Sequence, residues 1–453
     1  MLKKLFTILE KISPEKYRWV FSHEGFKRYF ANTGWMFFGQ VLYLLLAFFI
    51  GAWIARYLGP EKYGIVSYVV AFVGLFTFIS SLGVDGVIRR ELVKTPERHN
   101  ELMGTGFRLK LIGAGIAFFL VVVASFFFSR GSGLMQALIV LFGLGFFLQV
   151  PFIINIFFYA QVQAKRAIQA QLAAAIISSI LKIVLIYLGE GIIWLIVIYI
   201  LDAIWQGLFL VYLYKKEGFH FRKWKFNSKL AKTIWHDSWP LMLSAAAGYI
   251  YLRIDQVMVG QFMGEEAVGI YAAGVKLTEV FYFIPGVICG SLFTAIVNAK
   301  KTGAKMYFGR LKNLYFLLFA LAIFVAIPIS LLAKPIISVV FGSAYLASAG
   351  VLQLYIWSSV GLFIGSGVGS QLMTENRTKA IFWLNFATMI LNVGLNIYLI
   401  PLFGIIGAAL ATLISYSVLP LWLLFFGWKQ GSCLLYTSPS PRDRTRSRMP
   451  SSA

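Results

Sequence analysis

The chain has 453 residues, of which 59% are hydrophobic, 17% aromatic and only 13% charged, and its mean hydropathy is +0.78. A soluble domain is closer to half apolar and a quarter charged, so this composition excludes an ordinary soluble protein and indicates a polytopic membrane protein. The formal net charge of +23 does not indicate a nucleic-acid partner, because the basic residues stand in short segments between apolar runs.

The first predicted element, residues 1–30, is a cytoplasmic amphipathic segment. Leu2, Leu5, Leu9 and Ile12 recur at helical spacing on the side opposite the lysines, which predicts a helix lying on the membrane surface. The apolar part is too short and too charged to span a bilayer, and it lacks the pattern of a cleavable signal peptide.

Apolar stretches near the length of about 20 residues that a membrane helix needs follow along the chain. The twelve stretches are 33–57, 63–84, 106–128, 134–160, 167–188, 192–214, 239–262, 267–296, 311–333, 347–373, 380–400 and 404–427. Strands of a membrane barrel would be half as long and would alternate in polarity. We therefore expect an all-α polytopic membrane protein with about 12 transmembrane helices.

The distribution of basic residues predicts the orientation of these helices. With a cytoplasmic N-terminus, the inner segments hold 30 lysines and arginines, and the outer loops hold four, Arg56, Lys62, Arg130 and Lys334. Cytoplasmic loops carry such an excess of positive charge, so the count supports an even number of helices. The expected location is the cytoplasmic (inner) cell membrane.

An internal repeat divides the helices into two sets. Four residues match at a constant offset of 205: Gly59, Glu61, Gly64 and Ile65 against Gly264, Glu266, Gly269 and Ile270. We predict an N-lobe of helices 1–6 over residues 31–214, a basic cytoplasmic linker over 215–236, and a C-lobe of helices 7–12 over 237–429. Because each set has an even number of helices, the two lobes should be parallel and enclose a central cavity.

The tail, residues 430–453, is polar and rich in Pro, Ser and Arg. Its composition predicts a disordered cytoplasmic tail. The same residues also resemble translated vector or sequencing-adapter sequence joined to a truncated reading frame, in which case the natural chain would continue past helix 12.

Charged side chains inside the predicted spans form the candidate site. They are Lys182, Asp202, Arg253, Asp255, Lys276 and Glu279. Each costs about 2.5–3.5 kcal/mol at the centre of a membrane, so each should face a cavity or a partner. One interpretation is that they are salt bridges that hold helices 7 and 8 together, and the other is that they line a translocation path.

Helical spacing limits how these charges can pair. Lys276 and Glu279 are three residues apart and share a helix face. Arg253 and Asp255 lie about 200° apart around their helix, so the simplest arrangement turns one towards helix 8 and the other towards the cavity. Lys182 is near the outer end of its span and could reach outwards, while Asp202 could carry a proton or form a hydrogen bond between helices.

Motifs of enzymes are missing from the sequence. It has no P-loop, no Gly-rich nucleotide motif and no H-E-x-x-H pattern. The two cysteines, Cys289 and Cys433, are far apart and suggest neither a disulfide framework nor a metal site. We expect no enzyme activity, no cofactor and no metal.

Three motifs resemble the polysaccharide (Wzx-like) flippase family of the multidrug/oligosaccharidyl-lipid/polysaccharide exporter superfamily. The N-terminal motif is F-I-G-A-W-I-A-R-Y-L-G-P-E-K-Y-G at 49–64 with S-S-L-G-V-D-G-V-I-R-R-E at 80–91. The second lobe has R-I-D-Q-V-M-V-G at 253–260 followed by G-E-E-A-V-G-I-Y at 264–271. The third motif is N-V-G-L-N-I-Y-L-I-P-L-F-G-I-I-G-A-A-L-A-T at 392–412. The resemblance covers about residues 30–427.

This resemblance implies a transporter that flips polyprenyl-diphosphate-linked oligosaccharide units across the cytoplasmic membrane by alternating access, for cell-surface polysaccharide biosynthesis. The substrate and the membrane lipids would be its partners, and a polysaccharide polymerase and glycosyltransferases would work beside it. A diphosphate needs basic groups in place of water, so Arg253, Lys276 and Lys182 are the expected binding residues. Asp202, Asp255 and Glu279 would couple transport to protons or sodium, or pair with the basic residues.

Other functions remain open at this point. A cation-coupled multidrug or metabolite exporter on the same fold would have an acidic cavity and would tolerate the loss of Arg253 and Lys276. A membrane-embedded glycosyltransferase or polymerase would need a large outer loop or a nucleotide-sugar domain, and the loops here are short. A scaffold without transport activity is a further alternative.

Overall fold

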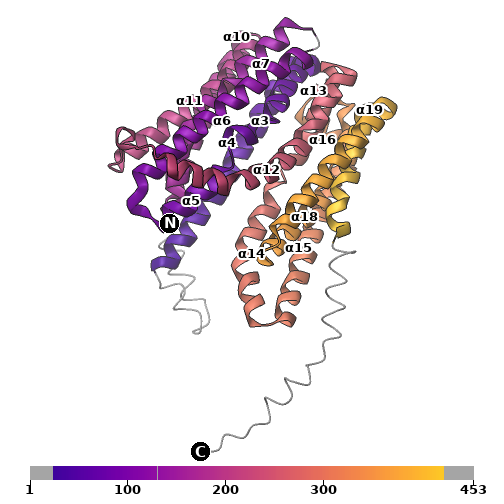
Figure 1. Cartoon of the computed structure of the whole chain (residues 1–453). Helices are drawn as coiled ribbons and strands as arrows, with labels where there is room; N and C mark the ends of the chain where they lie inside the picture. The colour runs from indigo at the N-terminus through magenta and orange to yellow at the C-terminus, as the bar shows by residue number, and fades with distance from the viewer. Residues whose placement is uncertain (1–23, 130, 423–453) are drawn as a thin grey trace, which may run out of the picture.

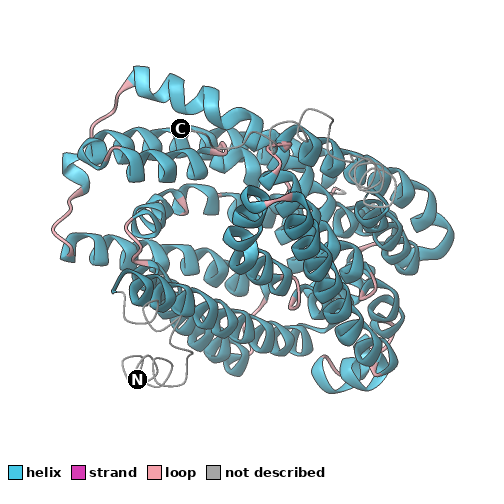
Figure 2. Cartoon of the chain, turned by 90° about the horizontal axis from the view of Figure 1, so that it is seen from below, coloured by secondary structure: helices cyan, strands magenta, loops and turns pink. Residues whose placement is uncertain are grey.

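The computed structural model describes residues 24–129 and 131–422. Within these ranges all regular structure is helical and no strand occurs, as Figure 2 shows. The expected all-α fold is therefore confirmed. The surface helix predicted for the first residues and the tail at 430–453 lie outside the described residues, except that 24–30 begin the first long helix.

The first half of the chain forms one group of helices, drawn in indigo to magenta in Figure 1. They are α3 (Glu24–Gly74), α4 (Thr77–Ser81), α5 (Val84–Lys94), α6 (His99–Phe128), α7 (Gly133–Gly143), α8 (Gly145–Leu148), α9 (Ile153–Ala160), α10 (Ala164–Leu188) and α11 (Ile192–Lys216), with short 3₁₀ helices at Pro96–Arg98 and Val150–Phe152.

The second half forms the other group, drawn in red to yellow, except that its first residues, up to the start of α12, pack on the first group. It begins with a 3₁₀ turn at Phe221–Lys223 and continues with α12 (Ser228–Met263), α13 (Glu265–Glu279), α14 (Phe283–Thr302), α15 (Ala304–Leu331), α16 (Ala333–Val340), a 3₁₀ turn at Ser343–Tyr345, α17 (Ser348–Tyr355), α18 (Ser358–Thr374) and α19 (Thr378–Trp422).

The described residues contain nine helical segments that are long and apolar enough to cross a membrane. Two of them, 34–74 and 378–418, have 41 residues each, about twice the length that one crossing needs. Gly59 (φ 71°) and Gly404 (φ 60°) interrupt these two segments with non-helical backbone, so each makes two crossings. The helix α12, with 36 residues, is not among the nine, and counting it as a crossing gives the twelve expected from the sequence.

Helix breaks follow the internal repeat. The single helix expected over 267–296 is broken between α13, which ends at Glu279, and α14, which begins at Phe283. The counterpart of Glu279 at the offset of 205 is Gly74, and α3 ends there. The spans expected at 134–160 and 347–373 are also divided into shorter helices. The repeat therefore extends from the turn motif to the end of the following helix.

The two repeated turns have the same backbone conformation. Gly59 has φ 71° and Gly264 has φ 95°. Both values lie in the left-handed region, which a residue without a Cβ adopts readily. In each lobe, this glycine lets the chain bend between one long helix and the next.

The repeated turns also lie against each other. A Cβ built on Gly64 would overlap the carbonyl oxygen of Glu265, and a Cβ built on Gly269 would overlap the carbonyl oxygen of Pro60. Pro60 and Glu265 are themselves counterparts at the offset of 205. The contact is therefore reciprocal, as a pseudo-two-fold axis between two parallel lobes requires.

The helix α3 joins the two lobes. It packs against α10 in its own lobe and against α13 in the other lobe. Tyr68 and Phe72 of α3 lie in one buried apolar cluster together with Val257 of α12 and Tyr271 of α13. Within a membrane, close van der Waals packing of such side chains stabilises the contact between the lobes.

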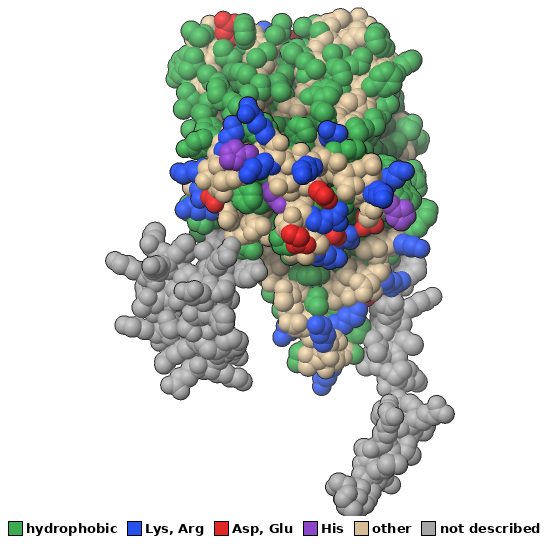
Figure 3. Space-filling model, turned by 60° about the vertical axis from the view of Figure 1, so that its left-hand side comes forward, with side chains coloured by type: hydrophobic (Ala, Val, Ile, Leu, Met, Phe, Trp, Pro, Cys, Tyr) green, Lys and Arg blue, Asp and Glu red, His purple; other side chains and the backbone are tan. Residues whose placement is uncertain are grey.

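The lobes meet at one end of the molecule and separate towards the other. In Figure 1 they are in contact beside α13, and they are apart at the end where α14 and α15 meet. Figure 3 shows a hydrophobic surface over the upper part of the molecule and a band of basic side chains below it. The apolar surface is suited to contact with lipid, and the basic band is on the side where the lobes are apart.

The predicted linker is partly helical. Of residues 215–236, the last part already belongs to α12, which begins at Ser228. Asn227 caps this helix by accepting hydrogen bonds from the backbone N–H groups of Lys229 and Leu230. The N–H of Lys225 donates to the carbonyl of Asn100 at 3.0 Å, so the linker is attached to the start of α6.

Candidate functional site

The helices α12 and α13 position most of the candidate charges. Glu265 and Glu266 occupy the first turn of α13, where negative charge is favourable to the helix dipole. The turn at Gly264 brings α13 back against α12. As a result, Arg253 on α12 lies opposite Glu279 in the last turn of α13.

Arg253 and Glu279 form an ion pair at the wall of a cavity. Arg253 Nη1 is 2.9 Å from Glu279 Oε1. Both residues and Lys276 line a cavity of about 260 Å³. Phe48 of α3, the repeat counterpart of Arg253, lines the same cavity. The pseudo-two-fold axis thus places an apolar wall opposite a charged one.

A second cavity adjoins the first. It measures about 160 Å³, and Lys182, Asp202 and Lys276 are among its lining residues. Lys182 is buried, with its Nζ 4.0 Å from the ring centroid of Tyr199, a cation–π distance. Lys182 therefore faces the interior of the protein and does not reach to the outer surface.

Lys276 lines both cavities, so the charged residues of the two cavities form one group. We define the cation cluster as Arg253, Lys276 and Lys182. The basic residues outnumber the acidic ones around it, since only Asp202 and Glu279 accompany them. Positive charge in a cavity with apolar walls attracts an anion more strongly than it would in water.

The acidic residues of the cluster are already held by protein partners. Glu279 pairs with Arg253, and Asp202 accepts a hydrogen bond of 2.9 Å from the hydroxyl of Ser178. In the described part of the chain, Lys276 forms no ion pair within 4.0 Å. Glu279 therefore pairs with Arg253 and not, as expected, with Lys276. This leaves Lys276 as the basic group available to a ligand.

Asp255 lies apart from the cavities. Its side chain is fully buried, and it accepts hydrogen bonds from the hydroxyl of Tyr271 at 2.5 Å and from the N–H of Gln256 at 2.8 Å. As the helical spacing predicts, Asp255 faces α13, which corresponds to helix 8, and Arg253 lines the cavity. Arg253 also reaches Glu279 of α13.

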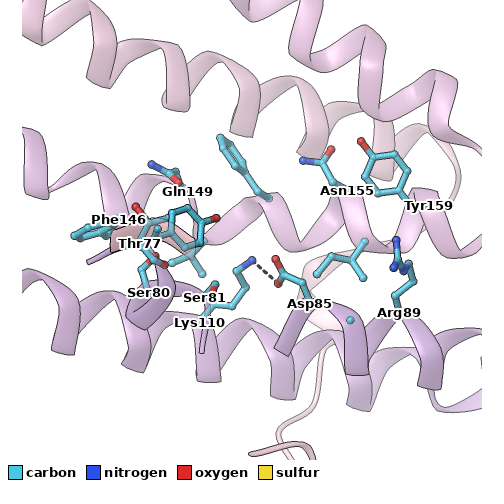
Figure 4. Close-up of a pocket in the computed structure, with 15 residues that line it drawn as sticks. Thr77, Ser80, Ser81, Asp85, Arg89, Lys110, Phe146, Gln149, Asn155 and Tyr159 are labelled. Atoms are coloured by element: carbon cyan, nitrogen blue, oxygen red, sulfur yellow. Dashed lines mark hydrogen bonds and ion pairs between the residues drawn. The ribbon is translucent and has the colours of Figure 1, made fainter. Parts of the chain in front are cut away.

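A third cavity, in the N-lobe, was not predicted from the sequence. It measures about 430 Å³ and is shown in Figure 4, with Lys110 Nζ 2.7 Å from Asp85 Oδ1 near its centre. Asp85 belongs to the quoted motif at 80–91, and Lys110 lies inside the span expected at 106–128. A basic residue inside an apolar run is the sequence signal for this cavity, but the count of 30 basic residues in the inner segments includes Lys110.

Metal binding has no support in the described ranges. Residues 24–129 and 131–422 contain no group of three His, Cys, Asp or Glu side chains placed to hold a metal ion. Cys289 is buried with a free thiol.

Family comparisons agree with this arrangement. A family model described as "Polysaccharide biosynthesis protein" matches residues 29–298, and the MatE model matches residues 240–398. A proposed O-antigen transporter of Shigella flexneri is 23% identical over 85% of this chain and 94% of its own length. A probable low-salt glycan biosynthesis flippase of Haloferax volcanii is 24% identical over 42% of this chain, but the match spans only 40% of that relative.

Solved structures share the fold. A multidrug resistance MATE family transporter of the MOP superfamily, in its inward-facing conformation, superposes with a TM-score of 0.70 at 18% identity and covers 88% of this chain and 96% of its own. The lipid II flippase MurJ, in an inward closed conformation, gives a TM-score of 0.67 at 19% identity and covers 86% of each chain.

Proposed function

Since the chain belongs to the polysaccharide biosynthesis protein family, within the MOP transporter superfamily, we propose that it flips polyprenyl-diphosphate-linked oligosaccharides across the cytoplasmic membrane. The protein is a multi-pass membrane transporter, and the families and relatives that it matches are transporters and not enzymes. In this proposal the N-terminus is cytoplasmic, and the basic band of Figure 3 faces the cytoplasm. The polymerase and glycosyltransferases of polysaccharide synthesis would supply and consume the substrate.

The observation that carries this proposal is the cation cluster. Lys276 stands between Arg253 and Lys182, at the junction of two cavities. A diphosphate is negatively charged and cannot enter the membrane interior unaided, so donors with positive charge must replace its water. The alternative, an exporter of cationic drugs, would require a cavity in which carboxylates predominate.

Transport of a labelled lipid tests the proposal. The purified chain in liposomes is expected to move undecaprenyl diphosphate that carries N-acetylglucosamine between leaflets, and empty liposomes are the control. An efflux assay with ethidium on the same vesicles tests the drug-exporter alternative. Movement of ethidium without movement of the lipid would reverse the assignment.

We further propose that Asp255 couples transport to a proton or cation gradient. Glu279 and Asp202 have partners at the cavities, whereas Asp255 is fully buried and is held only by neutral donors. A buried carboxylate without a basic partner is strongly destabilised while ionised, so gain of a proton or a cation would be favourable.

Asp255→Asn is expected to abolish the response of lipid movement to an imposed pH or sodium gradient while substrate binding is retained. Asparagine keeps the shape of the side chain and can still accept from Tyr271, but it cannot change its charge. The matched control is Asp237→Asn, which removes a carboxylate in the third turn of α12 that is 2.6 Å from Arg90. Arg90 holds the pKa of Asp237 below its ordinary value, so this carboxylate stays ionised and cannot be the coupling group. An unchanged gradient response in Asp255→Asn would refute the coupling role.

A further inference from the structure

The N-lobe cavity of Figure 4 is outside the cation cluster and larger than either of the cavities around it. Its walls come from α4, α5, α6, α9 and the segment from α8 to the 3₁₀ helix at Val150–Phe152, and a single residue of α12, Tyr249, contributes from the other lobe. None of its lining residues is shared with the two cavities around Lys276. It therefore requires an explanation of its own.

One acidic group in this cavity is fixed in place. The side chain of Lys110 is 11% exposed and that of Asp85 is 52% exposed, and their ion pair holds one carboxylate oxygen. The buried lysine fixes the orientation of Asp85, and the rest of the carboxylate faces the cavity. An exposed ion pair contributes little to stability, but a carboxylate with a fixed orientation can accept hydrogen bonds from a ligand.

A polar atom without a partner lies in the same wall. The side-chain oxygen Asn155 Oδ1 is buried and has no hydrogen-bond partner in the described part of the protein. An unsatisfied buried acceptor destabilises a protein by about 1–3 kcal/mol, so it is usually satisfied by water or by a ligand. Asn155 also lines the cavity, and a hydroxyl group bound there would supply the missing donor.

Aromatic rings complete the lining. Figure 4 shows Tyr159 and Arg89 beside Asn155 at one end of the cavity, and Gln149 and Phe146 at the other. Planar amides and a fixed carboxylate match pairs of neighbouring hydroxyls, and aromatic faces match the apolar C–H face of a pyranose ring. Asp85 and Lys110 already neutralise each other, and a lipid chain would leave the polar groups without partners.

The cavity is also well placed relative to the cation cluster. Tyr249 lies four residues before Arg253 on α12, so the two side chains are on one face, about 6 Å apart along the helix axis. A ligand whose diphosphate is at Arg253 could extend its sugar past Tyr249 into the N-lobe. We propose that the cavity lined by Asp85, Asn155, Gln149 and Tyr249 binds sugar residues of the lipid-linked substrate, an inference that rests on the proposed function.

Two lipid probes separate the roles of the two sites. Undecaprenyl diphosphate contains the anionic group alone, and undecaprenyl diphosphate carrying N-acetylglucosamine adds one pyranose. Binding of each to the purified full-length chain is measured by titration. The wild type should bind the sugar-bearing lipid about tenfold more tightly, a difference typical of one or two additional hydrogen bonds.

Asn155→Leu is the informative variant. It removes an acceptor that has no partner in the protein, so the fold should keep its stability, unlike a change at the buried Lys110. The variant should bind both lipids equally, with the affinity of the wild type for undecaprenyl diphosphate. The matched control is Gln163→Leu, which removes another buried amide oxygen without a partner, Gln163 Oε1, outside the cavity. This control should bind as the wild type does.

The outcomes distinguish this inference from the proposed function. Equal affinity of the wild type for the two lipids, preserved discrimination in Asn155→Leu, or an equal loss for both lipids in that variant would each overturn the sugar site. An unchanged affinity of Arg253→Ala for undecaprenyl diphosphate would instead contradict the diphosphate site of the proposed function. If Arg253→Ala weakens binding of both lipids and Asn155→Leu weakens only the sugar-bearing one, both assignments hold.

Discussion

Replacement of Arg253 by alanine is expected to lower the rate of lipid movement by about a hundredfold. Charge-assisted hydrogen bonds contribute about 1.5–3 kcal/mol each, and a loss of about 3 kcal/mol from the transition state corresponds to this factor. The measurement is leaflet exchange of labelled undecaprenyl diphosphate carrying N-acetylglucosamine in proteoliposomes. Lys62→Ala, which removes an exposed basic residue just after the break at Gly59 in α3, should leave the rate unchanged.

A second variant separates the loss of a ligand contact from damage to the protein. Arg253→Ala leaves the partly buried carboxylate of Glu279 without its partner, which destabilises the fold by itself. The double variant Arg253→Met, Glu279→Leu removes both charges and keeps similar volumes, so the melting temperature should return to that of the wild type. Transport should stay low, because the cation is still missing. Recovery of transport in the double variant would assign the pair a purely structural role.

The second large effect is expected at the contact between the repeated turns. Gly269→Ala should destabilise the protein by about 3 kcal/mol or more, because the new methyl group would occupy the position of a backbone oxygen. A Cβ on Gly269 would also lie 3.0 Å from the backbone nitrogen of Gly64, and neither backbone can rotate away as a side chain could. Thermal unfolding of the detergent-purified protein measures the change.

A matched glycine serves as the control for this prediction. Gly248 lies inside α12, and a Cβ built on it would meet no atom within 4 Å. Gly248→Ala should be neutral or slightly stabilising, because alanine favours helix formation more than glycine does. Equal melting temperatures for the two variants would contradict the close approach of α3 and α13.

Much of the fold could be predicted from the sequence because membrane helices have a strong compositional signal. The twelve crossings, the parallel lobes and the repeat all followed from apolar length, basic loops and a constant offset. The break after Glu279 was missed, since no proline or glycine stands at 280–282. The corresponding helix in the first lobe, α3, ends at Gly74, the counterpart of Glu279. This correspondence of helix ends can be recognised only from the coordinates.

The sequence predicts which charges lie close together, with a salt bridge between helices 7 and 8 as one interpretation, and their role in binding a substrate stays a prediction. Helical spacing identified Lys276 and Glu279 as neighbours, yet the closer partner of Glu279 is Arg253 on another helix. Contacts between helices depend on crossing angle and depth, which a single sequence does not fix. The ion pair of Asp85 and Lys110 could not be predicted for the same reason, because the two residues lie on different helices that come together only when the chain packs.

The reciprocal contact at the repeated turns has the form of an isologous interface, in which the same patch on two units is complementary to itself. Gly64 approaches residue 265 and Gly269 approaches residue 60, so each half offers the other the same surface. A six-helix unit with this turn could therefore associate with a second copy of itself as a parallel homodimer. Fusion of two such copies into one chain would preserve the interface, and the sequences of the two halves could then change independently. The charges at Arg253 and Lys276, whose counterparts at the offset of 205 are Phe48 and Ala71, are an asymmetry that a homodimer could not have carried.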